Sequence, residues 1–188
     1  RKFKGNIHHV HGVGVNTDKF VKLSEEDRQK LRLDKGYTDE FIILCTGELN
    51  KNKNQATLIK TMKDVVKKHP EAKLLLAGNG PEHDNLVKLI EELNLGDNVK
   101  LLGYRTDIQD YVNICDLVVS ASYREGLPLN IMEAMICGKP VIASDNRGHR
   151  ELIKDNENGI LVDLKNNNGF IDSINLLIDK KNIATKFS

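Results

Sequence analysis

The stretch from Phe41 to Gly80, FIILCTGELNKNKNQATLIKTMKDVVKKHPEAKLLLAGNG, decides the fold class. An apolar, β-rich run over 41–46 and a second one over 73–77 flank a helical pattern that we expect Asn54 to cap. Two strands joined by an amphipathic helix form a crossover unit, the connection that neighbouring parallel strands require. The stretch therefore predicts a parallel sheet. The apolar residues that share one face of its helix are Leu58, Ile59, Met62, Val65 and Val66.

The same alternation extends over the rest of the chain. Short, continuously apolar strands are covered on both faces in parallel sheets, so the pattern predicts an α/β, doubly wound, Rossmann-like domain. A length of 188 residues fits one such domain over residues 1–188. Further strands are expected over 7–15, 99–102, 117–121, 140–144 and 160–162. Further helices are expected from Ser24 to near Gly36, from Pro81 to Gly96, and over 107–115, 128–136, 147–154 and 169–180.

Composition excludes several classes of partner. The net charge is +1, Trp is absent and aromatic residues make up 5%, so nucleic acid and anionic membrane are not expected as main partners. Three widely spaced cysteines form neither a disulfide framework nor a zinc motif, which favours buried thiols in a reducing cytoplasm. No apolar run approaches the ~20 residues of a membrane span.

Both ends of the sequence favour an excised domain. The chain begins RKFKGNIHHV without a Met, and its last expected helix is followed by a polar tail.

The loops after the strands are the places to look for a site, because open parallel sheets bind ligands at the carboxyl ends of their strands. The loop 122–128 is followed by a helix that Pro128 is expected to start. Free amides at that helix start, those of Leu129, Asn130 and Ile131, suit a diphosphate. Glu125 precedes the helix and Glu133 lies eight positions later. Carboxylates on both sides of a phosphate site suit a nucleotide sugar, which has hydroxyls at both ends.

This segment resembles a known family. The pattern S-x-x-E-G-x-P-x-x-x-x-E-A-M-x-x-G-x-P-V-I-A-S over 122–144 is similar to the E-x7-E signature of GT-B, family 4 type (group 1) retaining glycosyltransferases. HGVGVNTDKF, GELNKNKNQATLIKTM, LLLAGNGPEHDNL, VKLLGYRTDIQDYVNICDLVVSAS and ENGILV resemble further family blocks in the same order. The chain therefore looks like the C-terminal, nucleotide-sugar-binding half of such an enzyme.

The resemblance assigns roles to residues. Glu125 would contact the donor sugar as the candidate catalytic residue, Glu133 the ribose, and Lys53 the phosphates. The backbone at Gly103, Tyr104 and Arg105 would contact the base. Two positions depart from the family: Glu48 stands where an Arg is usual, and Asn54 where a Gly is usual. Lys51 or Arg147 could supply the missing cation.

The resemblance also implies a function. The whole enzyme would transfer a sugar, with retention and without a metal or other cofactor, from a UDP-sugar to a saccharide or lipid-linked acceptor. It would serve polysaccharide biosynthesis in the cytoplasm or at the inner face of the membrane. Residues 1–20 would form the hinge, while the N-terminal acceptor domain and the final C-terminal helix would be absent. The isolated domain would then be inactive.

Other functions stay open. A UDP-sugar epimerase, a phosphorylase or a non-catalytic nucleotide-binding module could share this scaffold. A dehydrogenase is disfavoured, because His83 takes the place of the third glycine after Gly78 and Gly80. A metal site at His8, His9 and His11 is also disfavoured, because no carboxylate or Cys supports it at a suitable spacing.

Overall fold

The computed structural model describes residues 14–187, except for the side chain of Lys181. Its centre is a six-stranded sheet in the order β3-β2-β1-β4-β5-β6, and all neighbouring strands are parallel. This order is that of a doubly wound Rossmann-like sheet, so the predicted fold class is confirmed. The strands are β1 (Phe41–Thr46), β2 (Ala72–Ala77), β3 (Val99–Gly103), β4 (Leu117–Ser120), β5 (Val141–Ser144) and β6 (Ile160–Val162).

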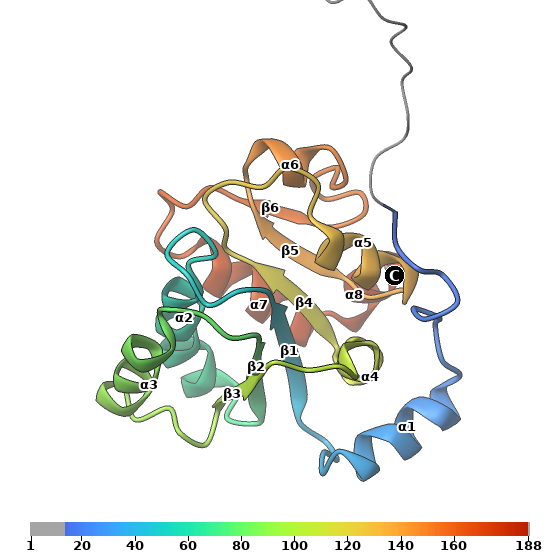
Figure 1. The fold of residues 1–188 in the computed structure, drawn as a ribbon, viewed down its shortest axis with the longest axis horizontal. Helices are drawn as coiled ribbons and strands as arrows, with labels where there is room; N and C mark the ends of the chain where they lie inside the picture. The colour runs from blue at the N-terminus through green and yellow to red at the C-terminus, as the bar shows by residue number, and fades with distance from the viewer. Residues whose placement is uncertain (1–13, 188) are drawn as a thin grey trace, which may run out of the picture.

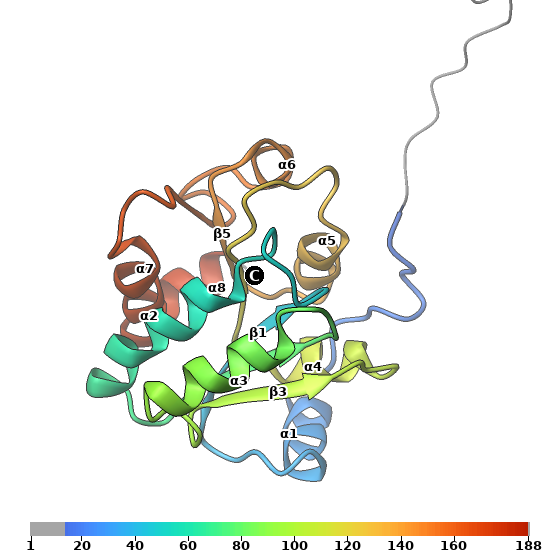
Figure 2. The ribbon, with the colours of Figure 1, turned by 60° about the vertical axis from the view of Figure 1, so that its left-hand side comes forward.

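Helices cover both faces of the sheet (Figure 1). One face carries α2 (Gln55–Lys68), α3 (His83–Glu92), α7 (Gly169–Asp179) and α8 (Lys181–Lys186), and Figure 2 shows α2 and α3 side by side on it. The other face carries α1 (Glu25–Asp34), α4 (Ile108–Ile114) and α5 (Leu129–Ile136). The short helix α6 (Arg147–Arg150) lies in the loop region after β5.

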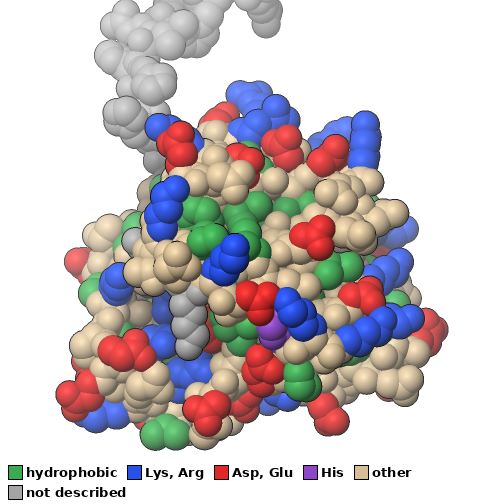
Figure 3. Space-filling view, turned by 180° about the vertical axis from the view of Figure 1, so that it is seen from behind, with side chains coloured by type: hydrophobic (Ala, Val, Ile, Leu, Met, Phe, Trp, Pro, Cys, Tyr) green, Lys and Arg blue, Asp and Glu red, His purple; other side chains and the backbone are tan. Residues whose placement is uncertain are grey.

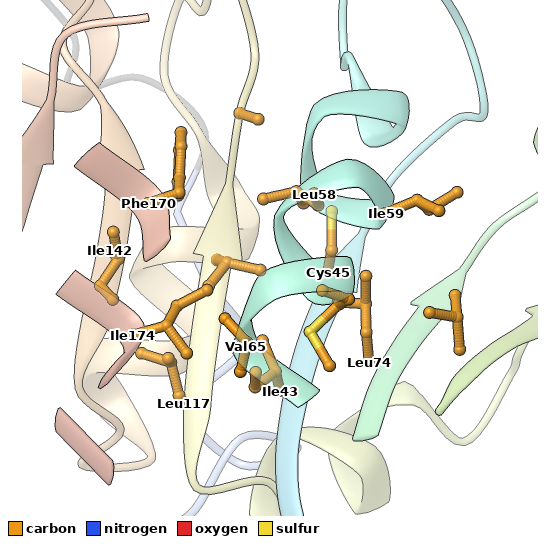
Figure 4. Close-up of a cluster of buried hydrophobic side chains, with 14 of the residues drawn as sticks. Ile43, Cys45, Leu58, Ile59, Val65, Leu74, Leu117, Ile142, Phe170 and Ile174 are labelled. Carbon is orange, nitrogen blue, oxygen red and sulfur yellow. The ribbon is translucent and has the colours of Figure 1, made fainter. Parts of the chain in front are cut away.

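The larger core cluster lies between the sheet and α2 and α7. In Figure 4, Ile43, Leu117 and Ile142 of three strands point toward Leu58 and Ile174 of these helices. The apolar face predicted for α2 is buried, because Leu58, Ile59, Met62 and Val65 are each at most 1% exposed. Burying such a side chain stabilises a fold by about 1.5–3 kcal/mol, so this face fixes α2 and the loop in front of it.

Several local predictions are wrong. Asn54 precedes α2 but adopts a left-handed conformation with φ of 54°, and its side chain does not cap the helix. This conformation is the one that a glycine adopts readily, which explains how Asn54 fills a position where the family usually has Gly. Helix α3 ends at Glu92, and Asn94 with φ of 54° follows its end in place of Gly96. Helix α5 begins at Leu129, so Pro128 is its N-cap and not its first residue.

Two predictions near the C-terminus also change. The helix expected over 147–154 is only α6, four residues long. The expected polar tail contains α8, and Phe187 behind it is buried in the larger core cluster. Ile183 and Ala184 of α8 pack against the same cluster, so these apolar side chains together with Phe187 hold a segment that is otherwise polar.

The strand predicted over 7–15 and the histidines His8, His9 and His11 fall largely in residues 1–13, outside the described residues. Gly14 and Val15 are described and are not part of a strand. Phe20 is 4% exposed and packs in the cluster beneath α4 and α5. This anchor holds the segment 14–20 against the domain.

Charged side chains lie on the surface, and the cysteines lie inside the fold. Figure 3 shows Lys, Arg, Asp and Glu side chains intermixed on the face that carries α2 and α7, without a continuous basic patch there. Cys45, Cys115 and Cys137 are free and buried, and burial raises the pKa of the Cys45 and Cys115 thiols to about 12. Within residues 14–187, none of the helices has the length and apolarity that crossing a bilayer requires.

Candidate functional site

The strand order places the candidate site between β1 and β4. From β1 the chain continues to β2 and β3 on one side of that strand, and it then returns to β4, β5 and β6 on the other side. The loops that follow β1 and β4 therefore diverge at the carboxyl ends of these two neighbouring strands. Ligands of doubly wound sheets bind at such a switch point. Lys53 lies in the loop after β1, and Glu125 lies in the loop after β4.

Lys53 and Glu125 form an ion pair across this point. Lys53 Nζ donates to Glu125 Oε1 at 2.7 Å, and the two side chains are 24% and 11% exposed. Gly47 provides space for the lysine, because a Cβ built there would lie 3.3 Å from Lys53 Cε. The sequence predicted both residues as donor ligands, and the structure brings them into direct contact.

Asn52 joins the two loops beside this pair. Its Nδ2 donates to the carbonyl oxygen of Arg124 (2.9 Å), and its Oδ1 accepts from the Arg124 amide (3.2 Å). The Asn52 carbonyl oxygen also accepts from the amide of Tyr123 at 2.8 Å. Asn54 Nδ2 donates to the carbonyl oxygen of Ala121 at 3.2 Å. These four bonds fix the loop of Glu125 relative to the loop of Lys53.

The loop after β5 supports Glu125 from the other side. The carbonyl oxygen of Ser122 accepts from Ser144 Oγ (2.5 Å) and from Asn146 Nδ2 (3.0 Å). A Cβ on Gly148 would lie 2.6 Å from the carbonyl oxygen of Glu125, so only glycine permits this approach. Sequence analysis missed these contacts and those of Asn52, because an isolated Asn or Ser carries no sign of a distant partner.

His149 belongs to the same support. It is fully buried, and its Nδ1 lies 2.7 Å from the carbonyl oxygen of Ser144, which can only accept, so this nitrogen carries the proton. Burial lowers the pKa of His149, opposed by its bond to Ser144 and by the charge of Glu125. His149 is therefore a neutral packing residue behind the Glu125 loop at neutral pH.

A cleft of about 580 Å³ lies next to the ion pair, which it adjoins through Gly47. The loops after β1 and β2 meet at its base, because a Cβ on Gly78 would lie only 1.9 Å from the carbonyl oxygen of Gly47. This volume falls within the ~300–1,000 Å³ of small-molecule sites. The polar and charged residues that line it are Lys19, Thr46, Glu48, Asn79, Tyr104, Arg105, Thr106 and Glu133.

Glu133 is the half-buried carboxyl of this cleft. It makes no hydrogen bond or ion pair with any side chain or amide in the described part of the chain. Burial raises its pKa above the ordinary value of 4.5, and the charge of Lys19 opposes this shift. Its two oxygens are therefore available to hydroxyl donors. Lys19 was missed as a site residue, since nothing in the sequence distinguishes it from its neighbours in the segment before Ser24.

The predicted base-binding loop is only partly in the cleft. Tyr104 and Arg105 line it, whereas Gly103 does not, and the Gly103 carbonyl oxygen is occupied by the amide of Gly78 at 2.8 Å. Tyr104 is 74% exposed, which leaves its ring accessible. Arg105 forms two bonds with Asp107, of 2.8 and 2.7 Å, that hold the pKa of this carboxyl well below its usual range.

Three backbone amides at the start of α5, those of Leu129, Asn130 and Ile131, were predicted to contact a phosphate, and among the described residues two of them are free to do so. The amides of Leu129 and Asn130 have no hydrogen-bond acceptor within residues 14–187. The amide of Ile131 already donates to the carbonyl oxygen of Pro128 at 3.1 Å, so it is less available to a phosphate than the other two. Asn130 Nδ2 donates to the carbonyl oxygen of Thr46, which ties the helix start to the end of β1.

The two cations considered in place of the missing family Arg lie elsewhere. Arg147 is 91% exposed with its nearest carboxylate on Glu151, and Lys51 lines a different pocket from Glu48. Glu48 itself lines the same cleft as Glu133, and its Oε2 accepts from Asn50 Nδ2 at 2.8 Å.

An open parallel sheet with a cleft, paired charges and close glycine contacts at its switch point defines an α/β protein of the Rossmann-like class with a candidate ligand site at the carboxyl ends of its strands. Comparison with known proteins makes this specific. The family model "Glycosyl transferases group 1" matches residues 24–188, so the chain belongs to the group 1 glycosyl transferases.

Curated relatives support this membership. The chain is 38% identical over 183 residues to EpsD of Bacillus subtilis, which bears the name of a glycosyltransferase. This alignment covers 97% of the chain and 48% of EpsD. The chain thus spans about half the length of the curated relatives it matches.

Solved structures share the fold. The structure of HepE from Anabaena in complex with UDP and glucose superposes with a TM-score of 0.83 and 30% identity, covering 93% of this chain and 48% of that one. The C-terminal domain of the group 1 glycosyl transferase LpcC from Francisella tularensis superposes with a TM-score of 0.82 and 28% identity, covering 93% and 92%. The second structure is itself an isolated C-terminal domain of a group 1 family protein.

Proposed function

We propose that this chain is the donor-binding half of a retaining, family 4 type glycosyltransferase with a UDP-sugar as its donor. The Lys53–Glu125 ion pair at the switch point, next to a cleft that contains Glu133, is the observation that carries the proposal. HepE, which this chain resembles at 30% identity, has been solved with UDP and with UDP-glucose. Membership of the family favours this function over an epimerase or a phosphorylase.

In this proposal, different residues contact different parts of the nucleotide-sugar donor. Lys53 and the amides of Leu129 and Asn130 contact the diphosphate, since a cation and a helix N-terminus stabilise the charge that develops on a leaving diphosphate. Glu125 contacts the sugar and Glu133 the ribose. Tyr104 and Arg105, which line the cleft, would contact the base. Because Lys53 and helix amides supply the positive charge, the reaction would need no metal or other cofactor.

The acceptor would be a saccharide or a lipid-linked saccharide, bound mainly by an N-terminal domain. The whole protein would act in polysaccharide synthesis, in the cytoplasm or at the inner face of the membrane. This chain alone would transfer no sugar, because orienting an acceptor against the donor supplies ~7–11 kcal/mol of a barrier and most of the acceptor contacts would come from the N-terminal domain.

A second candidate is a nucleotide-binding module without catalysis. Glu48 favours it, because a carboxylate in the donor cleft stands where the family usually has an arginine. Such a module would bind UDP but would not distinguish UDP from a UDP-sugar through Glu125.

Thermal unfolding with UDP, GDP, ADP and UDP-glucose tests the proposal. A ligand that binds only the folded state stabilises it by RT ln(1 + [L]/Kd), or ~2.7 kcal/mol at a hundredfold excess over Kd. We expect UDP and UDP-glucose to raise the melting temperature more than GDP or ADP. Stabilisation by GDP or ADP alone would refute the choice of base, and no response to millimolar nucleotide would refute the donor site.

A further inference from the structure

A second pocket, of about 310 Å³, lies on the other side of the loop that carries Lys53. It is formed by the loop after β1, the starts of α2 and α3, and the loop after β4. None of its lining residues lines the cleft that contains Glu133. The side chains that the argument uses are Lys51, Gln55, Glu82 and Tyr123.

We propose that this pocket binds a saccharide segment of the acceptor or product. The inference rests on the proposed function, because an enzyme that extends a saccharide must hold that saccharide near its donor. The pocket is small compared with the donor cleft, and its volume is at the lower end of the range for small-molecule sites, so it suits sugar rings and not a nucleotide sugar.

The lining has the groups that a sugar requires. Tyr123 is 57% exposed, so its ring offers an apolar face for the C–H side of a sugar, and its hydroxyl remains available as donor or acceptor. Lys51 is exposed and forms no ion pair within the described part of the chain, which leaves its ammonium free to donate to hydroxyl oxygens. Glu82 accepts from Asn85 through one oxygen, Oε2, which leaves Oε1 for a ligand hydroxyl.

Gln55, which lines this pocket, has one side-chain oxygen without a partner in the described part of the chain. It is 2% exposed, and its Nε2 donates to the carbonyl oxygen of Glu48 at 2.9 Å. Its Oε1 has no hydrogen-bond partner among residues 14–187. A buried acceptor without a donor is costly, so a rotation of the Gln55 amide toward the pocket, with a ligand hydroxyl or a water as the donor, would relieve this cost.

The position of the pocket connects it to the transfer site. Tyr123 lies two residues before Glu125, and Asn54, another lining residue, directly follows Lys53. The amide of Tyr123 donates to the carbonyl oxygen of Asn52, and this bond holds the loop after β4 against the loop after β1. The same two loops carry the Lys53–Glu125 pair and line the second pocket. A saccharide in the pocket would therefore lie on the same two loops as the donor, separated from it by the Lys53 loop.

Amide NMR titrations of the 188-residue chain test the proposal, with N,N′-diacetylchitobiose and cellobiose as probes, glycerol as a polyol control, and UDP titrated separately. We expect a disaccharide to shift the resonances of Lys51, Gln55, Glu82 and Tyr123. Tyr123→Ala should weaken this binding about three- to tenfold, the loss of one aromatic contact, and leave the affinity for UDP unchanged. Tyr104→Ala, the matched exposed tyrosine of the donor cleft, should weaken UDP and leave the disaccharide unaffected.

Glu82→Gln provides a second, isosteric variant that preserves the size of the side chain and should also weaken the disaccharide. Disaccharide shifts confined to Tyr104, Arg105 and Glu133 would overturn the proposal, since the sugar would then bind only in the donor cleft. An unchanged disaccharide affinity in Tyr123→Ala would also overturn it. Absence of any disaccharide shift together with normal UDP shifts would refute the saccharide pocket and leave the proposed donor function standing. Absence of both would refute the two proposals together.

Discussion

Lys53 and Glu125 are 72 residues apart in sequence, yet Lys53 Nζ lies 2.7 Å from Glu125 Oε1. The pair links the loops after β1 and β4 and compensates both charges in the donor-free domain. A phosphate that bound to Lys53 would compete with Glu125 for the ammonium. The released carboxylate would then be available to the sugar hydroxyls, so binding of the two halves of a donor would be coupled through this bond.

The first prediction separates the two members of this pair. Lys53→Ala should weaken both UDP and UDP-glucose about tenfold or more, since a hydrogen bond to a charged group is worth about 1.5–3 kcal/mol. Glu125→Gln should leave UDP equally tight or slightly tighter, because Lys53 loses its competing carboxylate, and should weaken UDP-glucose. Calorimetric titration of both ligands measures these differences.

Lys60→Ala is the control for this experiment, because Lys60 is an exposed lysine on α2, outside both pockets. It should change neither affinity. A loss of UDP affinity in Glu125→Gln as large as that in Lys53→Ala would contradict the assignment of sugar and phosphate to separate residues.

The second prediction is that Glu133→Gln stabilises the fold but weakens UDP. Burial raises the pKa of Glu133, so the folded state binds this proton more tightly than the unfolded state. The ionised carboxylate therefore lowers the stability of the fold once the pH rises above 4.5, the ordinary pKa of a glutamate. A neutral glutamine amide removes this cost. A gain of about 1 kcal/mol would raise the melting temperature by ~2–4 °C in a domain of this size.

The pH dependence of UDP binding provides the second measurement for Glu133. Affinity of the unmodified chain should fall as acidification protonates Glu133, beginning above the ordinary pKa of a glutamate because the pKa is raised. The diphosphate also titrates, but it does so equally with both proteins, so the ratio of the two affinities isolates Glu133. A ratio that does not vary with pH would exclude Glu133 as the ribose ligand.

Periodicity was sufficient to predict the sheet, because apolar runs such as 41–46 and amphipathic helices such as α2 are local patterns that burial enforces. The resemblance indicated Lys53 and Glu125 as site residues but not the bond between them, which depends on the strand order. Asn54 was misinterpreted as a cap, since its left-handed conformation is set by a tertiary bond to Ala121 and not by its neighbours in sequence. Lys19 was missed for a similar reason: it reaches the cleft only because Phe20 is anchored beneath α4 and α5.

The third prediction concerns Asn52, which we identify as a positioning residue. Asn52→Ala removes two side-chain bonds to the Arg124 backbone, so the Glu125 loop should sample more conformations and UDP-glucose should bind about three- to tenfold more weakly. Binding of UDP alone should change less, because Lys53 and the start of α5 remain. Calorimetry with both ligands measures this selective loss.

Asn98→Ala is the matched control for Asn52. Asn98 Nδ2 also makes two bonds to backbone, to the carbonyl oxygens of Pro70 and Ala72, at the opposite edge of the sheet. Its loss should lower the melting temperature without changing the preference for UDP-glucose over UDP. Equal changes of that preference in both variants would mean that Asn52 acts only through stability.

The last prediction concerns Glu48, the carboxylate that lines the donor cleft where the family usually has an arginine. A diphosphate in this cleft would be repelled by it, and at separations near 8 Å across partly solvated space this repulsion amounts to roughly 0.5–1 kcal/mol. Glu48→Gln retains the shape and the contact with Asn50, so it should bind UDP about two- to fivefold more tightly. Glu48→Arg should bind it more tightly still.

Because the effect is a screened interaction of exposed charges, both gains in UDP affinity should shrink as salt rises from ~0.05 to about 1 M, where the Debye length falls to ~3 Å. Titrations of UDP at low and high salt provide the measurement, and the neutral ligand uridine, which lacks the diphosphate, should bind all three proteins equally. Weaker binding of UDP by Glu48→Gln would contradict the repulsion and indicate that the Glu48 carboxylate accepts a hydroxyl of the ligand.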